Sequence, residues 1–345
     1  MSDTLVSIII NNYNYAKYVR NAIDSALKQL YSNIEVIVVD DGSTDDSQTL
    51  IKEYGGRIKS IFKANGGQAS AYNIGFVASN GQVVVFLDAD DILHKDAIYY
   101  VMDEFKDDNV VKVQFRLEII DDEGKSSGIH TPAGKMPNGN VLNILLRYGS
   151  YGSPPASGNV YRRTALNKIM PIPESNWRIA ADAVPSLASP FFGDIRSIDK
   201  VLGYYRVHNI IKGSGQNINL SRPGNAASLS GKMEEFLKTE KYLKELCVKY
   251  NKNEQVNVIY NNPATLKTLL SFKILEPNHL YNKKCKVIKL ALMGINASIK
   301  YPLYSTFHKI GIISWFFLVL ICPLSIKKKL IILGLQPLIR GFNIK

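Results

Sequence analysis

Three aspartates follow a short apolar run, at a spacing that suits the binding of a divalent metal ion. Residues 83–87 are apolar throughout and predict a buried strand at the centre of a sheet. Residues two apart in an extended segment point to the same side, so we expect Asp88 and Asp90 to face one ligand. Their oxygens suit Mg²⁺ or Mn²⁺, which keep positions open for substrate phosphates. Asp91 has an alternative role as the N-cap of a helix expected over residues 97–105.

Polar and aromatic residues follow two earlier predicted strands, over residues 6–10 and 34–39. After the first strand, Asn11-Asn12-Tyr13-Asn14-Tyr15 offers Tyr13 either as a ring that stacks on a flat base or as a surface residue of a loop. After the second strand, Asp40-Asp41-Gly42-Ser43 offers carboxylates that accept hydrogen bonds from a base or a ribose. A tight turn with a helix N-cap is the alternative, and both roles are compatible.

A pair of glycines precedes the helix expected over residues 70–79, within Asn65-Gly66-Gly67-Gln68-Ala69. Such a loop either brings backbone N–H groups to a diphosphate or forms a plain helix-entry turn. No Gly-Lys-Ser or Gly-Lys-Thr follows it, and the glycine spacing is not that of a dinucleotide-binding G-x-G-x-x-G motif. Kinase-like and NAD-dependent chemistry are therefore disfavoured.

Alternating strand and helix patterns position these polar segments. Strands are predicted over residues 6–10, 34–39, 58–62 and 83–87, and helices over 18–30, 48–54, 70–79 and 97–105. The alternation indicates an α/β fold with a mainly parallel central sheet flanked by helices. Ligands of such sheets bind beyond the carboxyl ends of the strands, which is where the polar segments lie. The Gly, Pro and Ser content of residues 121–160 predicts a mobile loop or lid.

The basic charge of the chain is confined to its last third. The 345 residues carry a formal net charge of +12, yet residues 1–222 hold 23 Lys and Arg against 24 Asp and Glu, whereas residues 223–345 hold 19 against 6. A composition of 46% hydrophobic and 21% charged residues excludes a disordered or collagen-like chain. A neutral domain followed by a basic region favours an anionic membrane surface over nucleic acid as the partner.

We therefore expect a catalytic domain over residues 1–222, a helical extension over 223–300 and a membrane-associating tail over 301–345. Helices are predicted in the extension over residues 233–250, 266–275 and 287–299. In the tail, residues 310–326 form an almost wholly apolar run, which Pro323 interrupts near its end. Seventeen helical residues span about 25 Å, less than a hydrocarbon core of about 30 Å. An interfacial or re-entrant helix is thus preferred over a membrane span or a buried core helix.

The cysteines and the N-terminus predict a cytoplasmic protein at the inner face of the cell membrane. Cys247, Cys285 and Cys322 are odd in number and widely spaced, which predicts free thiols in a reducing compartment. Residues 1–4 lack the positive n-region of a secretory signal, and the apolar run that follows them is short.

In this order and spacing, the polar segments resemble those of the family 2 glycosyltransferases. The matching segments are Ser7 to Asn14, Val38 to Ser43, Asn65 to Gly67 with Asn73 and Gly75, and Phe86 to Asp91. The resemblance covers about residues 5–212. It implies the GT-A fold, a nucleotide-sugar-binding α/β sheet, here with a C-terminal α-helical extension. It also implies a metal-dependent, hexosyltransferase-like enzyme of the bacterial surface-glycan type.

The resemblance implies donor-side roles for several residues. Tyr13 and Asp41 would contact the base of the nucleotide sugar, and Asp88 would contact its ribose and diphosphate. Asp90 would hold the divalent metal, Mn²⁺ or Mg²⁺. The implied donor is a nucleotide-diphospho-sugar, with a UDP-sugar preferred.

Further donor-side residues come from the glycine loop and from the strand expected to close the domain. Gly67 and Asn73 match the family's loop and are expected to bind the nucleotide sugar. Tyr72 stands where many relatives have an Arg that steadies the diphosphate, so any such charge must come from elsewhere. Downstream, Arg206 is expected to offset phosphate charge and His208 to bind the metal or the diphosphate, with satisfied structural contacts as the alternative for both.

The expected general base is Asp182, in Trp177-Arg178-Ile179-Ala180-Ala181-Asp182, where Ala181 replaces the family's usual Glu. The implied reaction is an inverting single displacement. Asp182 takes the proton of an acceptor hydroxyl, which attacks the anomeric carbon of the donor sugar. Residues 157–163 resemble the acceptor-side segment of the family. The acceptor is expected to be a glycan or a lipid-linked molecule, because the C-terminal region is basic and apolar.

Two other functions stay open at this point. A sugar-phosphate nucleotidyltransferase also combines an α/β sheet with metal-binding carboxylates, but it is expected to carry a Gly-rich, basic segment where this chain has residues 11–14. A catalytically silent, membrane-associated binding protein is compatible with Ala181. A processive polymer synthase is disfavoured, because only one apolar segment approaches the length of a membrane span.

Overall fold

The computed structural model describes residues 4–212, 216–219, 229–277 and 286–335. The chain divides into two compact units, one formed by Met1–Val141 and Ser153–Val207, the other by Leu142–Gly152 and His208–Lys345. The predicted division at residues 222 and 300 stays a prediction. Residues 223–228 of the predicted extension and 336–345 of the predicted tail lie outside the described residues.

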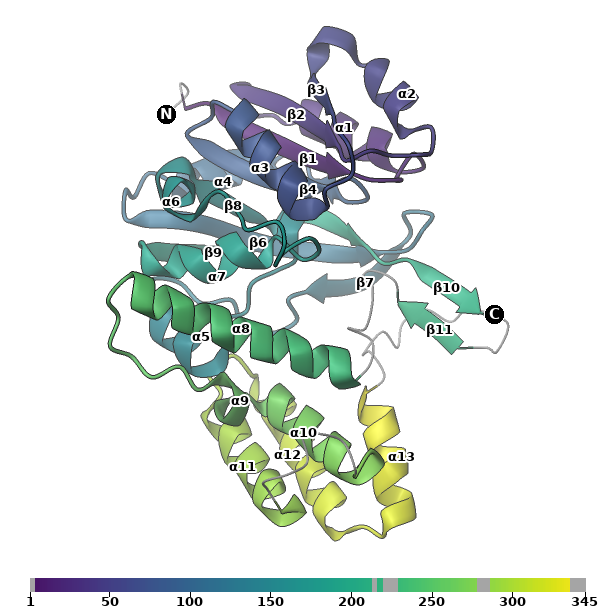
Figure 1. Cartoon of the computed structure of the whole chain (residues 1–345), viewed down its shortest axis with the longest axis vertical. Helices are drawn as coiled ribbons and strands as arrows, with labels where there is room; N and C mark the ends of the chain where they lie inside the picture. Colours follow the sequence, from purple (N-terminus) through teal and green to yellow (C-terminus); the bar gives the residue numbers. More distant parts are fainter. Residues whose placement is uncertain (1–3, 213–215, 220–228, 278–285, 336–345) are drawn as a thin grey trace. The chain divides into compact units, whose positions relative to one another are not determined.

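One mixed sheet organises the first unit (Figure 1). In sheet order its described strands are β3 (Lys59–Phe62), β2 (Ile34–Asp40), β1 (Val6–Asn12), β4 (Val83–Asp88), β8 (Asn159–Arg162), β6 (Val110–Ile120), β9 (Asp194–Arg206) and β5 (Ile92–Leu93), and β7 (Ser126–Thr131) pairs with β6. The strands β3, β2, β1 and β4 run parallel, and β8 is antiparallel to both β4 and β6. The predicted α/β class and the central place of β4 are confirmed.

Helices cover the sheet, and apolar side chains fill the space between the layers. The helices of this unit are α1 (Val19–Leu27), α2 (Ser47–Lys52), α3 (Gln68–Ala78), α4 (Ala97–Glu104), α6 (Arg163–Ile169) and α7 (Ala183–Ala188). Residues on both faces of β1 and β4 are buried, as their continuous apolar runs predict. The register of β1 sets Asn11 opposite Asp88 and Asn12 opposite Asp40, which brings the polar ends of three strands together.

Residues 121–160, predicted to be a loop or lid, instead carry short regular elements. They contain β7, the helix α5 (Leu142–Tyr148), a 3₁₀ turn at Ala156–Gly158 and the first residues of β8. Gly124, Gly128 and Gly139 all have positive φ angles, but of these only Gly124 lies in the turn between β6 and β7. Gly128 lies within β7, and Gly139 forms an isolated bridge with Ile195. The glycine-rich composition therefore does not mark one long loop.

Helices dominate the second unit, which also contains the hairpin β10 (Asn209–Lys212) and β11 (Gln216–Asn219) (Figure 1). The helices are α5, α8 (Leu229–Lys249), α9 (Val258–Asn261), α10 (Pro263–Leu275), α11 (Val287–Lys300), α12 (Thr306–Ile321) and α13 (Leu324–Leu335). The helices predicted around residues 233–250, 266–275 and 287–299 are confirmed. Cys247 and Cys322 are free thiols, and Cys285 lies outside the described residues.

The apolar core of the second unit joins α10, α11, α12 and α13. Leu270, Leu290, Phe316 and Ile331 are all buried in it. A Cβ atom at Gly294 would lie 2.2 Å from the Phe316 ring, so the glycine allows α11 and α12 to approach closely. The packing of these four helices thus depends on contacts between residues of different helices.

The apolar run at residues 310–326 is split between two helices. The side chain of Ser305 caps the start of α12, and the helix ends at Ile321, just before Pro323. Proline lacks a backbone N–H and cannot continue the helix, so the chain turns before α13 begins. Across the described ranges, no helix is both long enough and apolar enough to cross a bilayer.

Candidate active site

Asp88 lies at the carboxyl end of β4, within a group of polar side chains. Its Oδ1 atom accepts hydrogen bonds from Asn11 Nδ2 at 3.1 Å and Gln68 Nε2 at 3.3 Å. Burial, followed by the negative charges of Asp90 and Asp182, raises the pKa of Asp88 to about 7. Asp90 and Asp182 therefore both lie close enough to Asp88 to influence it electrostatically, although Asp182 is distant in sequence.

The backbone after Asp88 is a turn, so the expectation that Asp88 and Asp90 share an extended segment is wrong. The strand β4 ends at Asp88, and the N–H of Asp91 donates to the Asp88 carbonyl at 3.1 Å. Asp91 does not cap α4, whose N-cap residue is Asp96. Instead Asp91 is buried, and its carboxylate accepts hydrogen bonds from Ser157 Oγ at 2.6 Å and from the Arg206 N–H at 2.9 Å.

Arg206 is also buried, and its guanidinium ties the turn at residues 89–91 to the end of β6. Its Nε atom donates to the Asp90 carbonyl at 2.9 Å, and its Nη1 atom donates to the Asp121 carbonyl at 2.7 Å. The same group lies 4.6 Å from the centre of the Tyr18 ring. These contacts give Arg206 a structural role, and its predicted role in offsetting phosphate charge stays a prediction.

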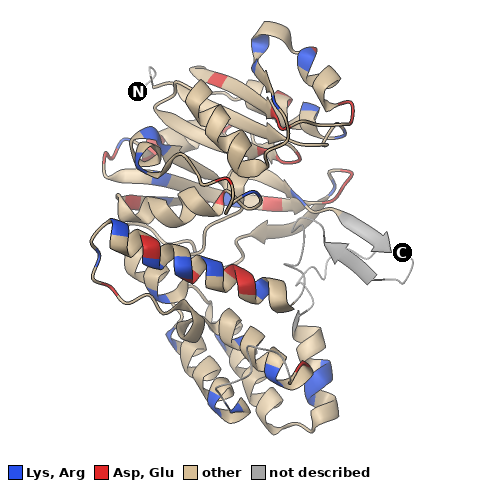
Figure 2. Ribbon diagram, in the orientation of Figure 1, with Lys and Arg blue, Asp and Glu red and all other residues tan. Residues whose placement is uncertain are grey.

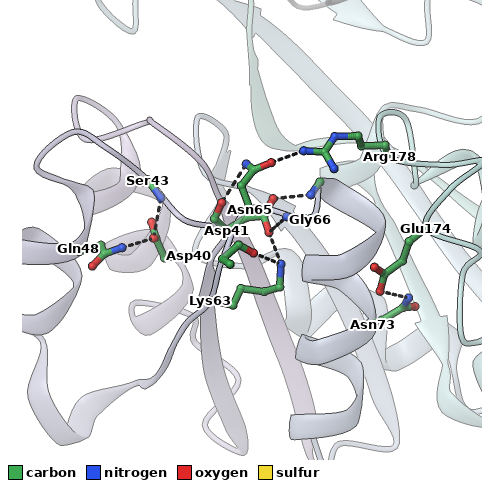
Figure 3. A network of polar contacts seen from close by, with 12 residues as sticks. Asp40, Asp41, Ser43, Gln48, Lys63, Asn65, Gly66, Asn73, Glu174 and Arg178 are labelled. Carbon is green, nitrogen blue, oxygen red and sulfur yellow. Dashed lines mark hydrogen bonds and ion pairs between the residues drawn. The ribbon is translucent and has the colours of Figure 1, made fainter.

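The paired aspartates after β2 hold the neighbouring loops in place. Asp40 accepts hydrogen bonds from the Ser43 N–H and from Gln48 Nε2, both at 3.0 Å (Figure 3). The carboxylate of Asp41, a residue only 3% exposed, forms an ion pair with Lys63. The two aspartates therefore face different partners, and the predicted contact of Asp41 with a nucleotide base stays a prediction.

The backbone N–H groups of the glycine loop are bonded within the chain. The N–H of Gly66 donates to the Asp41 carboxylate at 2.9 Å (Figure 3). The N–H of Gly67 donates to the same carboxylate at 2.6 Å, and that of Gln68 donates to the Arg178 carbonyl at 2.8 Å. Of the two alternatives for this loop, the structure shows a helix-entry turn with Gly67 as the N-cap residue of α3, and diphosphate binding stays a prediction. The role of Gly67 in donor binding stays a prediction.

Asp182 directly precedes α7, and the turn that leads to it contains a strained residue. Ala180 has a φ angle of +59°, in the left-handed region that a non-glycine residue rarely adopts. The N–H of the next residue, Ala181, donates to Gln68 Oε1 at 2.9 Å. Backbone strain of this kind gathers at functional sites, where the surrounding structure holds it in place.

A buried lysine lies near Asp182 and was missed by sequence reasoning. Lys112 on β6 is fully buried, and its ammonium donates to Ser153 Oγ at 2.7 Å and Gln114 Oε1 at 3.2 Å. Burial lowers the pKa of Lys112 well below its usual value, and the negative charge of Asp182 opposes that shift. The available signal was a lysine placed between the valines at positions 110, 111 and 113 of β6.

The remaining predicted residues take varied positions. Tyr13 is 46% exposed just after β1, whereas Tyr72 is buried and stacks on Phe86 with ring centres 4.1 Å apart. Asn73 exchanges two hydrogen bonds with the backbone of Ile172, at 2.9 and 2.7 Å. His208 belongs to the second unit and is half-buried. The donor and metal roles predicted for Tyr13, Asn73 and His208 stay predictions.

The carboxylates after β4 are suited to a divalent cation that takes most of its ligands from water and substrate rather than from protein side chains. Asn11 Oδ1 is buried beside Asp88 and has no hydrogen-bond partner among the described residues. No set of three or more His, Cys, Asp or Glu side chains in the described ranges is arranged to hold a metal ion. A Mg²⁺ or Mn²⁺ ion bound by one or two carboxylates, with water and substrate phosphates as its other ligands, agrees with both observations.

Comparisons with known proteins place the chain in a family. The model for glycosyl transferase family 2 matches residues 7–170. An uncharacterized glycosyltransferase of Nostoc sp. is 36% identical over 262 residues, which is 74% of this chain and 80% of the relative. Chondroitin synthase of Escherichia coli is 37% identical over 134 residues, which is 37% of this chain but only 20% of that enzyme.

A solved structure supports the fold. The structure of S. aureus TarS in complex with UDP-GlcNAc has a TM-score of 0.54 and 19% sequence identity, and the match covers 86% of this chain and 80% of TarS. At that identity the similarity establishes the shared architecture alone, and the expected GT-A fold is confirmed. The Nostoc relative and the family model carry the assignment further: the chain belongs to glycosyl transferase family 2 and is a glycosyltransferase.

Proposed function

We propose that the protein moves a sugar from a nucleotide-diphosphate donor to a hydroxyl acceptor, with inversion at the anomeric carbon. One observation carries the proposal: the negative charges of the neighbouring Asp90 and of Asp182, which is distant in sequence, both act on the buried Asp88, whose pKa is raised to about 7. Groups with perturbed pKa values that gather at strand ends are typical of active sites. Asp182 receives the proton of the attacking acceptor hydroxyl.

The donor is bound at the carboxyl ends of β1, β2 and β4. We assign Tyr13 and Asp41 to the base, Asp88 to the ribose and diphosphate, and Gly67 and Asn73 to the loop beside them. A UDP-sugar is the first donor to test, because TarS binds UDP-GlcNAc in a similar fold. The match to chondroitin synthase supports an acceptor in surface polysaccharide synthesis, although the chain spans a fifth of that enzyme.

A divalent ion, Mn²⁺ or Mg²⁺, completes the proposed site. Asp90 would hold it, assisted by Asp88, and the bound ion would offset the negative charge of the departing diphosphate. We also propose His208 as a ligand of this ion, because of the family resemblance. Arg206 contributes by holding the turn that carries Asp90.

A donor screen tests the proposal. Nucleotide sugars are incubated with Mn²⁺ or Mg²⁺, with and without a lipid extract as acceptor, and the released nucleoside diphosphate is measured. Asp182→Asn is expected to bind the donor normally and to lose at least 100-fold in transfer. The control Asp108→Asn, at an exposed aspartate of the same unit, should match the wild type. Near wild-type transfer by Asp182→Asn would refute the base assignment.

The same assay separates the alternatives. A sugar-phosphate nucleotidyltransferase releases pyrophosphate, whereas a glycosyltransferase releases a nucleoside diphosphate. Metal-dependent donor turnover excludes a catalytically silent binding protein. Failure to turn over any donor, with or without the lipid extract, would count against the transferase.

We also propose that the protein acts in the cytoplasm, at the inner face of the cell membrane, through the outer α12 face. This face consists of the exposed side chains Phe307, Ile310, Phe317, Leu318 and Ile321. With 3.6 residues per turn these five positions fall on one side of the helix, so they form one apolar stripe along it. The opposite side of α12 holds the buried Phe316 and Val319.

The charge around this stripe favours an anionic bilayer over a second copy of the chain. Residues 286–335 contain seven Lys and no Asp or Glu, whereas both signs alternate along α8 (Figure 2). Two copies meeting at this surface would bring like charges together. At an anionic bilayer, by contrast, each lysine near the membrane surface contributes about 1 kcal/mol to the free energy of binding.

Vesicle binding tests this location. Phe317→Asp is expected to lower partitioning onto vesicles of phosphatidylcholine and phosphatidylglycerol at least 10-fold. Val77→Asp replaces an 84% exposed side chain of α3 and serves as the matched control. Sedimentation of both variants measures their oligomeric state. If Phe317→Asp converts a dimer into a monomer and leaves vesicle binding unchanged, the face binds another copy and the membrane proposal fails.

A further inference from the structure

We propose that Gln68 is a positioning residue that links the donor-side carboxylate Asp88 to the loop carrying the base Asp182. The inference rests on the proposed function, in which these two aspartates serve the donor and the acceptor. Neither composition nor motif spacing indicates this role. It emerges from hydrogen bonds that join positions 113 residues apart in the sequence.

Gln68 uses its backbone and its side chain to hold both sides of the strained turn at Ala180. Its N–H donates to the Arg178 carbonyl at 2.8 Å, and its Oε1 accepts from the Ala181 N–H at 2.9 Å. The left-handed residue Ala180 lies between these two contacts. Because Ala181 directly precedes Asp182, the amide oxygen of Gln68 fixes the backbone from which the base projects.

The other end of the same amide reaches the donor side. Gln68 Nε2 donates to Asp88 Oδ1 at 3.3 Å and to the Tyr72 hydroxyl at 3.4 Å. One planar group therefore contacts the carboxylate assigned to the donor and the backbone beside the base. An amide suits this position because one end accepts from an N–H group while the other donates to a carboxylate.

The surrounding packing limits how Gln68 can move. The preceding residue, Gly67, has a φ angle of +89°, and a Cβ atom there would lie 2.4 Å from Arg178 Cγ. The first turn of α3 therefore lies directly against the loop at residues 178–181. A shift of Asp88 when the donor binds would be transmitted through the Gln68 amide to that loop, so that the base is aligned when donor is present.

Two substitutions separate the two ends of the amide. Gln68→Glu keeps an oxygen for the Ala181 N–H but loses the donor to Asp88 and adds a like charge beside it. We expect the Kd of the nucleoside diphosphate and the KM of the donor to rise at least 10-fold, with kcat within threefold of wild type. Gln68→Met loses both contacts, and we expect kcat at saturating donor to fall at least 10-fold as well.

A matched control measures how much the loss of a buried, hydrogen-bonded glutamine lowers the Tm and kcat by itself. Gln29 also connects two segments through one amide, since Nε2 donates to the His94 carbonyl at 2.9 Å and Oε1 accepts from the Ile98 N–H at 3.1 Å. Gln29→Met is expected to lower the Tm while kcat stays within twofold of wild type. If Gln29→Met and Gln68→Met lower kcat equally, the role of Gln68 is merely structural.

A second-site change tests the link to the strained turn. Glycine adopts the left-handed conformation without strain, so Ala180→Gly lowers the need for an external clamp. We expect Ala180→Gly to restore kcat of the Gln68→Met variant at least threefold, while leaving the kcat of an otherwise wild-type chain within threefold.

Each result decides the matter. If Gln68→Met does not fold, the donor affinity of Gln68→Glu decides, and unchanged affinity would overturn the inference. If the wild type transfers sugar, Asp182→Asn does not and Gln68→Met is normal, the proposed function stands and the coupling through Gln68 fails. If the wild type transfers nothing, the proposed function itself fails.

Discussion

The carboxyl ends of the parallel strands bury charged side chains, whereas the outer α12 face exposes apolar ones. Both regions thus depart from the usual arrangement of a polar surface around an apolar core. At the strand ends, Asp41, Asp91 and Arg206 are buried and bonded to other parts of the chain. On the outer α12 face, Phe307 is 89% exposed. Charged residues are seldom buried without partners, and contiguous apolar patches are seldom exposed in monomers.

The two regions differ in the kind of partner that their surfaces suit. Buried charges at the strand ends are held by hydrogen bonds that fix their direction, which suits a small polar ligand of defined geometry. The apolar stripe on α12 lacks such direction, which suits a broad, fluid surface such as a bilayer. The following substitutions test whether each region depends on the contacts described for it.

The largest effect is expected at the interior of α12. Phe316→Ala removes a fully buried ring that packs against Gly294, and we expect a loss of about 3–5 kcal/mol in the free energy of unfolding of the second unit. The adjacent Phe317→Ala, at an exposed position, should change it by less than about 0.5 kcal/mol. Chemical denaturation followed by tryptophan fluorescence provides the measurement. Equal effects of the two substitutions would mean that the sides of α12 are assigned wrongly.

A smaller loss is expected at the glycine loop. Gly67→Ala would place a methyl group 2.6 Å from the Arg178 carbonyl oxygen in a left-handed backbone conformation. We expect a loss of about 2–4 kcal/mol in stability together with a fall in transfer, because the loop at residues 178–182 must move. Gly128→Ala is the control, since its φ angle is also positive and a Cβ atom there meets no atom within 4 Å. Identical behaviour of the two variants would contradict the close packing at Gly67.

The smallest effect concerns Lys112 and depends on pH. Burial lowers the pKa of Lys112 in the folded state below the ordinary value of 10.5, so the unfolded chain binds more protons between these two values. The stability of the wild type should therefore rise with pH across that interval. Lys112→Met should be more stable than wild type by about 1–2 kcal/mol at neutral pH, and the difference should shrink as pH approaches 10.

Thermal unfolding at a series of pH values measures this trend. Lys59→Met, which removes an exposed lysine on β3, serves as the control for the loss of one positive charge. A stability difference that grows with pH for Lys112→Met would contradict the lowered pKa.

The sequence predicts the sheet well because its central strands are continuous apolar runs bounded by polar residues. Those runs place Asp40, Asp41 and Asp88 at strand ends, as the structure confirms. The direction of each carboxylate could not be predicted in the same way. The sequence predicts Asp88 and Asp90 on one side of an extended segment, but β4 ends at Asp88 and the next two residues form a turn.

The contacts that unite the site are invisible to local patterns. Gln68 meets Ala181 across 113 residues, and Arg206 meets Asp91 across 115. The strained residue of the turn is Ala180, not the glycine or asparagine from which a positive φ angle could be predicted. Such features arise from the packing of whole segments, so only the assembled structure reveals them.

The helix α5 has a consequence for how the chain folds during synthesis. It belongs to the second unit although it is followed in sequence by β8 and β9 of the first. The last residue of α5 is Tyr148, whose carbonyl accepts a hydrogen bond from Asn262 Nδ2 at 2.6 Å. The centres of the Tyr148 and Tyr301 rings lie 5.0 Å apart. On the ribosome, α5 emerges more than a hundred residues before these partners. Its apolar residues therefore lack these partners until the second unit has been synthesised.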